Sequence, residues 1–204
     1  MAFSPEHITA GRRHIGRCDP VMRRLVDQVG PFRLKVRRDR FGMLVSSIIA
    51  QQISWKAAKS IRARLWALVA PERITPHNLA ALPIAMLRSA GVSPQKAGYL
   101  HDLAAKVDSR SVRLDRVGRM PDDDVIAELV QVKGIGVWTA QMFLMFSLGR
   151  LDVFPHDDLG IRAALKNLYR LAELPDKQTS LEIARPWRPY ATIASWYCWR
   201  SHEL

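Results

Sequence analysis

The feature that most constrains this fold is the spacing of apolar residues, which repeats about every 3.6 residues along almost the whole chain. A helix with this spacing presents one apolar face to a core. Apolar and basic residues alternate strictly only from Phe32 to Val36, which is too short to imply a sheet. We therefore expect an all-α fold, with residues 32–36 as a linker.

Capping residues place several helix ends. Asp19-Pro20 can begin a helix and Gly30 can end it, because Asp caps helix starts, Pro fits the first turn and Gly suits the position after the last turn. Ser54 and Ser93 can cap two more helices. Further helices are expected around 41–49 and over 82–91, 122–132, 137–148, 158–169 and 188–199.

The segment "VKGIGVWTA" places Gly134 and Gly136 between two of these helical patterns. Glycines can supply positive φ angles and allow close approach of the backbone. The N–H groups at the start of the following helix, with its dipole, form a site for an anion such as a phosphate. An isolated Gly-x-Gly is equally compatible with a plain turn between helices. Lys133 would contact phosphate or stay solvated.

The charge of the chain favours the phosphate interpretation. It has 31 Lys and Arg against 19 Asp and Glu, a formal net charge of +12. An excess of this size favours a polyanionic partner, and nucleic acid is a commoner partner of compact basic proteins than a membrane surface. A basic bias in overall composition is the alternative explanation.

Five segments carry a family resemblance. "LVQVKGIGVWTAQMFLMF" looks like the helix-hairpin-helix of a DNA glycosylase superfamily, and "DVFPHDDLGIRAAL" resembles the Gly/Pro-rich loop and aspartate that follow it. "FGMLVSSIIAQQIS", "GVSPQKAGYLHDLA" and "RPWRPYATIASWYCW" are similar to segments of its 3-methyladenine DNA glycosylase II branch. The resemblance runs from about Phe41 to Trp199.

The resemblance implies a fold with two helical lobes. One lobe would be continuous over residues 37–133, and the other would combine residues 1–36 and 134–204, with the hairpin at the junction. The DNA cleft and Asp158 would lie between the lobes. The chain would lack the small N-terminal β-domain of longer members of the branch.

Asp158 is the catalytic residue that the resemblance implies. Breaking an N-glycosidic bond passes through a sugar with oxocarbenium character, which a nearby carboxylate can stabilise while it orients or deprotonates water. Seen alone, Asp157 and Asp158 are both compatible with simple helix capping. Ile161 follows Asp158 at the family spacing, so Asp157 is expected to cap or position and His156 to be a loop residue.

The resemblance also assigns a base pocket and a wedge. Trp138 and Trp196 match pocket tryptophans whose electron-rich faces would attract a cationic alkylated base. Met142 stands where the best-known branch member has a tyrosine. Gln52 falls where relatives insert a side chain into the duplex, and Gln51 is expected to hydrogen-bond within the protein. Of the other tryptophans, we assign Trp66 and Trp199 to packing and leave Trp187 open.

Two absences point to a hydrolase without lyase activity. Bifunctional members carry a nucleophilic lysine where this chain has Trp138, and the cysteine quartet of the endonuclease III branch is missing. We expect a monofunctional glycosylase that removes alkylated purines, such as 3-methyladenine and 7-methylguanine, from double-stranded DNA. A glycosylase for a neutral lesion, uracil or hypoxanthine, and a non-catalytic binder of DNA structures remain as alternatives.

The remaining expectations concern cofactors and location. Two cysteines, Cys18 and Cys198, cannot build a zinc or iron–sulfur site unaided, and we expect no cofactor and no metal ligands among the site residues. A monovalent metal beneath the hairpin is left open. No apolar run resembles a signal peptide or reaches the length of a membrane span. We expect a monomer in the cytoplasm, associated with the nucleoid.

Overall fold

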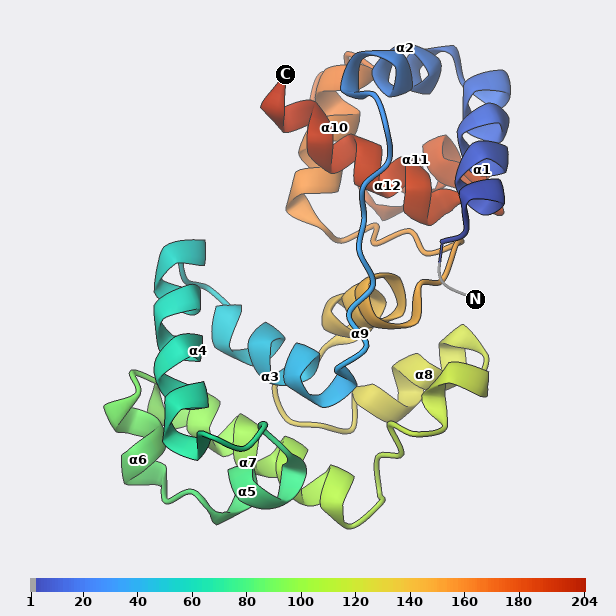
Figure 1. Ribbon diagram of the computed structural model, residues 1–204. Helices are drawn as coiled ribbons and strands as arrows, with labels where there is room; N and C mark the ends of the chain where they lie inside the picture. Colours follow the sequence, from blue (N-terminus) through green and yellow to red (C-terminus); the bar gives the residue numbers. More distant parts are fainter. Residues whose placement is uncertain (1–2) are drawn as a thin grey trace. The chain divides into compact units, whose positions relative to one another are not determined.

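The computed structural model describes residues 3–204, and within this range the chain forms helices joined by loops, without a strand (Figure 1). The prediction of an all-α fold is confirmed. The chain forms two compact units, which we describe one at a time. Unit 1 comprises residues 1–36 and 144–204, and unit 2 comprises residues 37–143.

Unit 1 is built from both ends of the chain. In it, α2, α10 and α1 pack around α12, and α11 leads into a short 3-10 helix that contacts α1. Its core contains large side chains from helices far apart in the sequence, among them Ile15, Leu25, Leu165 and Tyr197. The elements of unit 1 are α1 (Pro5–Cys18), α2 (Pro20–Val29), η2 (Leu144–Leu148), α10 (Leu159–Leu168), α11 (Lys177–Ala184), η3 (Arg185–Trp187), α12 (Ala191–Arg200) and η4 (Ser201–Glu203).

A buried carboxylate links the ends of the chain within unit 1. Asp19 caps α2 through its Oδ1 atom, which accepts from the backbone N–H of Val21 at 2.9 Å and Met22 at 3.1 Å. Its Oδ2 atom accepts from Trp187 Nε1 at 2.9 Å and from the Tyr169 hydroxyl. Burial, with a contribution from Asp19, raises the pKa of Tyr169. Trp187, whose role was left open, therefore supports this core.

Unit 2 is organised around two helices. α3 contacts α4, α7 and α9, while α7 also packs on α5 and α6, and α8 packs on α9. Leu44, Val45 and Ile48 of α3 are fully buried, as the apolar stripe predicted. The elements of unit 2 are α3 (Arg40–Ala50), α4 (Trp55–Val69), α5 (Pro76–Ala81), α6 (Ile84–Ser89), α7 (Pro94–Asp108), η1 (Val117–Arg119), α8 (Asp122–Leu129) and α9 (Val137–Phe143).

The capping signals were accurate, whereas some helix extents were not. The side chains of Asp19, Ser54 and Ser93 accept the expected backbone N–H bonds at helix starts. The helix expected over 137–148 is α-helical only to Phe143 and continues as the π-helical turn η2. Residues 32–36 form neither helix nor strand, as expected of a linker.

The border between the units lies later than the resemblance suggested. The expected lobe ended at Lys133, whereas unit 2 extends through Phe143. The physical reason is that α9 packs on α3 and α8, so the second hairpin helix shares the core of unit 2. None of the helices in residues 3–204 combines the length and apolar character that crossing a lipid bilayer would require.

Candidate functional site

The hairpin in unit 2 joins α8 to α9 through Lys133–Gly136. Gly134 has a φ of +80°, and a Cβ atom there would lie 2.1 Å from Cδ2 of Tyr99, so only glycine fits. Gly136 is not in the left-handed region, and a Cβ atom there would have no neighbour within 4 Å. The expectation that both glycines supply a positive φ is therefore wrong for Gly136, which instead leaves the start of α9 open.

The hairpin is held against α7 by a carboxylate. The backbone N–H of Lys133 donates to Oδ2 of Asp102 at 2.8 Å, and Lys106 Nζ donates to the same oxygen at 2.7 Å. Burial opposes the ionised form of Asp102, but these hydrogen bonds and the two positive charges outweigh it, so its pKa lies below the ordinary value. Ile135 is buried, while the side chain of Lys133 is exposed. The Ile135 side chain thus anchors the hairpin and leaves its backbone at the surface.

The turn between α3 and α4 is tied to the hairpin. Lys96 Nζ donates to the carbonyl oxygens of Ile49 at 2.8 Å and Gln51 at 2.7 Å. Gln51 Nε2 donates to the carbonyl oxygen of Gly134 at 2.7 Å. The structural role expected of Gln51 is confirmed, and the hydrogen bond fixes this turn relative to the hairpin.

Gln52 occupies an unusual position in the same turn. It is exposed and has a φ of 55°, a left-handed conformation that few residues other than glycine adopt. Such conformations persist where the surrounding structure holds them, and they are common at ligand-binding sites. The hydrogen bonds from Lys96 and Gln51 supply that restraint here.

The two predicted pocket residues on α9 differ in accessibility. Trp138 is 43% exposed, whereas Met142, one turn further along the helix, is only 7% exposed. Val137 beside Trp138 is also exposed. The start of α9 therefore presents apolar surface, while Met142 lies mostly within the core of unit 2.

Asp158 is the N-cap of α10 in unit 1. Its Oδ1 atom accepts from the backbone N–H of Ile161 at 2.8 Å, so the capping alternative describes its geometry correctly. The same oxygen accepts from Trp199 Nε1 at 2.9 Å. Two donors from α10 and α12 thus hold this carboxylate in one orientation.

Trp199 corrects the assignment made from the sequence. We expected it to serve in packing, and its ring does stack on Phe146 with centroids 5.9 Å apart, but its N–H group also contacts Asp158. Gly160 leaves the necessary space, because a Cβ atom there would lie 3.1 Å from Asp158 Oδ1 and 3.3 Å from Trp199 Cδ1. No spacing rule pairs positions 41 residues apart, so the sequence carried no signal for this contact.

The neighbouring loop residues have a different arrangement. Asp157 does not cap α10; its Oδ2 atom lies 3.2 Å from His156 Nε2, and its side chain is 68% exposed. Of the two roles expected for Asp157, capping is therefore wrong, because Asp158 occupies the N-cap position, and a positioning role stays a prediction. Asp157 offers a chemically matched control for Asp158 one residue away.

Trp196 lies on α12 and lines a cavity of about 500 Å³ in unit 1. Its ring meets Phe32 and Tyr197 edge-on, with centroids 4.9 Å and 5.0 Å away. The guanidinium carbon of Arg200 lies 5.9 Å from the centroid of the Trp196 ring. This indole therefore already has a cation near its face, in a cavity that Arg33 also lines.

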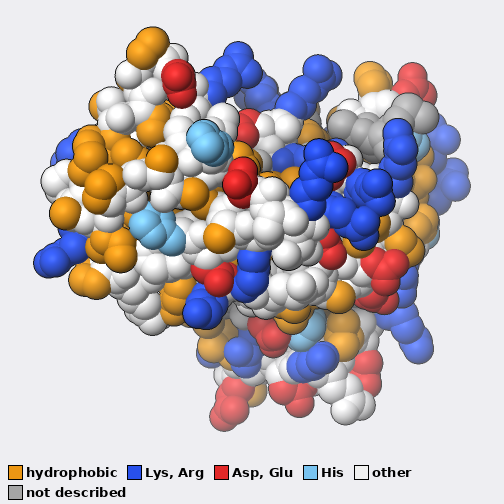
Figure 2. All heavy atoms as spheres, turned by 90° about the horizontal axis from the view of Figure 1, so that it is seen from below, with side chains coloured by type: hydrophobic (Ala, Val, Ile, Leu, Met, Phe, Trp, Pro, Cys, Tyr) orange, Lys and Arg blue, Asp and Glu red, His pale blue; other side chains and the backbone are white. Residues whose placement is uncertain are grey.

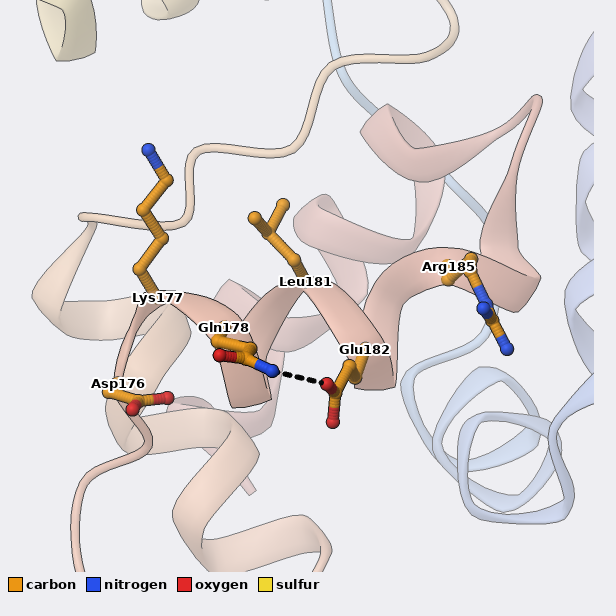
Figure 3. A pocket seen from close by; sticks show the side chains of 6 residues that line it. All are labelled: Asp176, Lys177, Gln178, Leu181, Glu182 and Arg185. Carbon is orange, nitrogen blue, oxygen red and sulfur yellow. Dashed lines mark hydrogen bonds between the residues drawn. The ribbon is translucent and has the colours of Figure 1, made fainter.

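A second depression in unit 1 contains none of the predicted site residues. It has a volume of about 520 Å³ and runs along α11 (Figure 3). Asp176 caps this helix by accepting from Thr179 N–H, and Gln178 donates to Glu182 across the next turn. These polar groups serve α11 itself, so the depression is separate from the candidate site.

Positive charge is widespread on the surface. Figure 2 shows Lys and Arg side chains at many points of one face, with acidic side chains among them.

In residues 3–204 no group of three or more His, Cys, Asp or Glu side chains is placed to hold a metal ion.

Comparison with known proteins identifies the family. The model of the HhH-GPD superfamily of base excision DNA repair proteins matches residues 45–189, which include the hairpin, Asp158 and Trp187. The chain belongs to the HhH-GPD superfamily. DNA-3-methyladenine glycosylase 1 of Schizosaccharomyces pombe is 32% identical over 202 residues, covering 97% of this chain and 89% of that protein.

Solved structures of HhH-GPD relatives agree with this assignment. The S. pombe 3-methyladenine DNA glycosylase in complex with abasic DNA superimposes with a TM-score of 0.87 at 32% identity, covering 96% of this chain and 97% of that one. A DNA-3-methyladenine glycosidase from Bacillus halodurans gives a TM-score of 0.85 at 35% identity, covering 97% of this chain and 89% of that one.

Proposed function

We propose that this HhH-GPD protein is a monofunctional DNA glycosylase that hydrolyses the N-glycosidic bond of alkylated purines, of the 3-methyladenine and 7-methylguanine type, in double-stranded DNA. The observation that carries the proposal is the Asp158 carboxylate, oriented by Ile161 N–H and Trp199 Nε1 at the start of α10. Similarity over nearly the full length to two alkylpurine glycosylases supports the substrate class.

Asp158 would act on the sugar of a flipped nucleotide. As the bond between the base and the sugar breaks, the anomeric carbon gains positive charge, and a fixed carboxylate stabilises that charge more than it stabilises the ground state. Because Ile161 N–H and Trp199 Nε1 donate to the same oxygen, Oδ1, the plane of the carboxylate is set before the substrate arrives. The same group would orient or deprotonate the water that attacks the anomeric carbon.

Trp138 and Trp196 would hold the damaged base. Alkylation at N3 or N7 makes a purine cationic, and an exposed indole face attracts such a base more strongly than a neutral one. The start of α9 offers Trp138 for this role, because its ring is half exposed. At Trp196 the cationic base would have to displace Arg200 from the indole face or share that face with it. Met142 is buried and would contribute only a small part of the pocket wall.

The hairpin would bind a DNA phosphate through its backbone. Open space at Gly136 and the N–H groups at the start of α9 suit a phosphate oxygen, and the exposed Lys133 adds positive charge. Gln52 would enter the duplex beside the flipped nucleotide. Its exposed position in the restrained α3–α4 turn supports this role.

The absence of lyase activity is part of the proposal. A lyase needs an amine that attacks the sugar and forms a Schiff base. The position expected for that lysine is Trp138, which has no such group, and the nearby Lys133 precedes the hairpin turn. Borohydride should therefore trap no covalent complex between the protein and lesion DNA, and a trapped complex would refute this part.

The experiment that tests the proposal measures free methylpurine released from alkylated duplex DNA by the wild type and by Asp158→Asn. We expect release by the wild type alone, with strand breaks appearing only after alkali. Each protein is first checked for folding by circular dichroism. If the wild type releases no methylpurine from DNA that it binds tightly, the proposed substrate class is wrong.

A further inference from the structure

One face of α4 carries two basic side chains between two aromatic ones. Trp55, Lys59, Arg62 and Trp66 follow one another at intervals of four, three and four residues. Residues at these intervals lie on the same side of an α-helix, one above the next. We call this set of four side chains the α4 stripe. It extends over about 16 Å, given a rise of 1.5 Å per residue.

The end of the stripe nearest the α3–α4 turn is an exposed indole. Trp55 is 75% exposed and begins α4, three residues after Gln52. Lys59 Nζ lies 5.1 Å from the centroid of its ring. Single apolar side chains on a protein surface are common and need no explanation. Trp55, however, lies close to Gln52, the proposed wedge in the α3–α4 turn. Its ring offers a flat surface at the place where a base of the duplex would be unstacked.

The other end of the stripe lines a basic groove. The groove has a volume of about 460 Å³, and Lys59, Arg62 and Trp66 form one side of it. Arg37 and Arg38, which precede α3, line it too. The nearby carboxylate of Asp39 accepts from Gly42 N–H at 2.9 Å and caps α3, so it serves the helix as well as facing this cluster. Four basic side chains against one carboxylate make the groove suitable for a polyanion.

We propose that the α4 stripe binds the DNA strand that runs past the α3–α4 turn, with Trp55 stacked on a nucleobase next to the lesion and the Lys59 and Arg62 side chains on successive phosphates. This inference rests on the proposed glycosylase function and adds a stacking side chain, Trp55, next to the proposed wedge Gln52. Surfaces that combine aromatic faces with basic groups bind nucleic-acid strands because bases stack on the rings while phosphates pair with the cations. The length of the stripe matches about five base steps of one strand.

The α4 stripe is continuous with the α3–α4 turn that carries Gln52, and this favours DNA over an acidic peptide as its ligand. Trp55 and Gln52 belong to one exposed stretch, which the Lys96 and Gln51 hydrogen bonds hold against the hairpin. A strand that reaches Gln52 therefore passes within reach of the start of α4. An acidic peptide would use the charges of the groove but would not account for an indole at the turn.

The first test measures the dissociation constants of Trp55→Ala by fluorescence anisotropy, on a labelled duplex with one tetrahydrofuran abasic-site analogue and on the same duplex undamaged. We expect binding to the abasic duplex to weaken roughly tenfold or more, with a smaller loss on the intact duplex, because a stacked base contributes most where the helix is already interrupted. Trp55→Phe should recover part of the affinity. Met86→Ala, at a 40% exposed apolar position on α6 of the same unit, is the matched control and should bind as the wild type does.

The second test concerns the phosphates. Arg62→Gln should weaken both duplexes by the same factor and reduce the slope of log affinity against log salt by about one, as expected for one lost phosphate contact. Arg88→Gln, an exposed arginine on α6, should leave the slope unchanged. Equal melting temperatures would show that the substitutions at half-buried Arg62 and exposed Arg88 leave the fold intact.

The outcomes separate this inference from the proposed function. Affinity of Trp55→Ala for the abasic duplex within twofold of the wild type would overturn the inference, even if methylpurine release is normal. Loss of binding to a polyglutamate peptide instead of DNA would also overturn it and show a protein-docking surface. A wild type that releases no methylpurine, yet shows the Trp55 and Arg62 effects on DNA, would refute the proposed activity and leave the strand contact standing.

Discussion

The hairpin region of unit 2 and the Asp158 region of unit 1 prepare their sites in different ways. At the hairpin, side chains act as supports: Asp102, Gln51 and Tyr99 hold the backbone, and the group offered to a ligand is peptide N–H. At Asp158 the side chain itself is the working group, and the donors that orient it come from α10 and α12. Tertiary hydrogen bonds support both sites, but at the hairpin they hold a backbone in place, whereas at Asp158 they orient a side chain.

The largest expected effect is at Asp158. Asp158→Asn should lower methylpurine release by about 10² to 10⁴-fold, because it removes the negative charge and the possible base. Asn caps helices as well as Asp does, so the melting temperature should change little. Rates from single-turnover release assays, together with thermal melts, measure both effects.

Asp157→Asn is the control for that substitution. It changes the same group one residue away on an exposed side chain that faces His156. Activity close to that of the wild type is expected. If instead Asp157→Asn abolishes release while Asp158→Asn retains it, the roles of the two aspartates are reversed.

The two hairpin glycines should respond differently, which sharpens the contrast within unit 2. Gly134→Ala should reduce the free energy of unfolding by about 1–3 kcal/mol, because alanine disfavours the positive φ and its Cβ would meet the Tyr99 ring. Gly136→Ala meets no neighbour and should leave unfolding nearly unchanged while weakening binding to damaged and undamaged duplexes by the same factor. Denaturant unfolding and anisotropy titrations separate the two effects.

A loss of affinity confined to damaged DNA in Gly136→Ala would contradict the phosphate role of the hairpin. Equal unfolding free energies for the two variants would contradict the steric account of Gly134.

Trp199→Phe tests whether the tertiary hydrogen bond matters for catalysis. Phenylalanine keeps an aromatic ring against Phe146 but cannot donate to Asp158. We expect kcat to fall roughly tenfold with little change in KM, since a hydrogen bond to a charged group is worth about 1.5–3 kcal/mol, part of which relaxation of the site recovers. Steady-state kinetics on a duplex with a single lesion measures the split.

Trp187→Phe provides the comparison for Trp199, because it removes a similar hydrogen bond from the indole to a carboxylate, at Asp19 in the core. Trp187→Phe should have a lower melting temperature than the wild type, while the kcat of the folded protein should equal that of the wild type. A lower melting temperature with unchanged kcat in Trp199→Phe would show that its contact with Asp158 is only structural.

The smallest expected effect is the pH dependence of the hairpin support. The folded-state pKa of Asp102 lies below its ordinary value of 3.8, so its ionised form stabilises the fold above that pH, and this stabilisation is lost as the pH falls through the folded-state pKa. Asp102→Asn should therefore be less stable than the wild type at pH 7, by under about 1 kcal/mol. The difference should shrink below pH 4 in urea titrations; a difference that persists at pH 2 would assign it to packing.

Many helix starts could be predicted because their signals are local. Asp19, Ser54 and Ser93 cap helices through hydrogen bonds to residues two or three positions away, so short spacing rules find them. Helices α1, α5 and α11 were not predicted. The apolar patterns of α5 and α11 are short, and packing decides whether such segments are helical. The start of α1 carries a local signal that would have predicted it, the capping Ser4 followed by Pro5.

The sequence by itself determined the helical class, the helix starts, the Gly-x-Gly turn and the family segments, since each depends on residues within a few positions of one another. Only the tertiary structure decided that Gly134 faces Tyr99, that Gln51 reaches the hairpin carbonyl, and that Trp199 donates to Asp158. These contacts join residues 35, 83 and 41 positions apart. The packing of whole helices brings such residues together, and no periodic pattern in the chain encodes which pairs will meet.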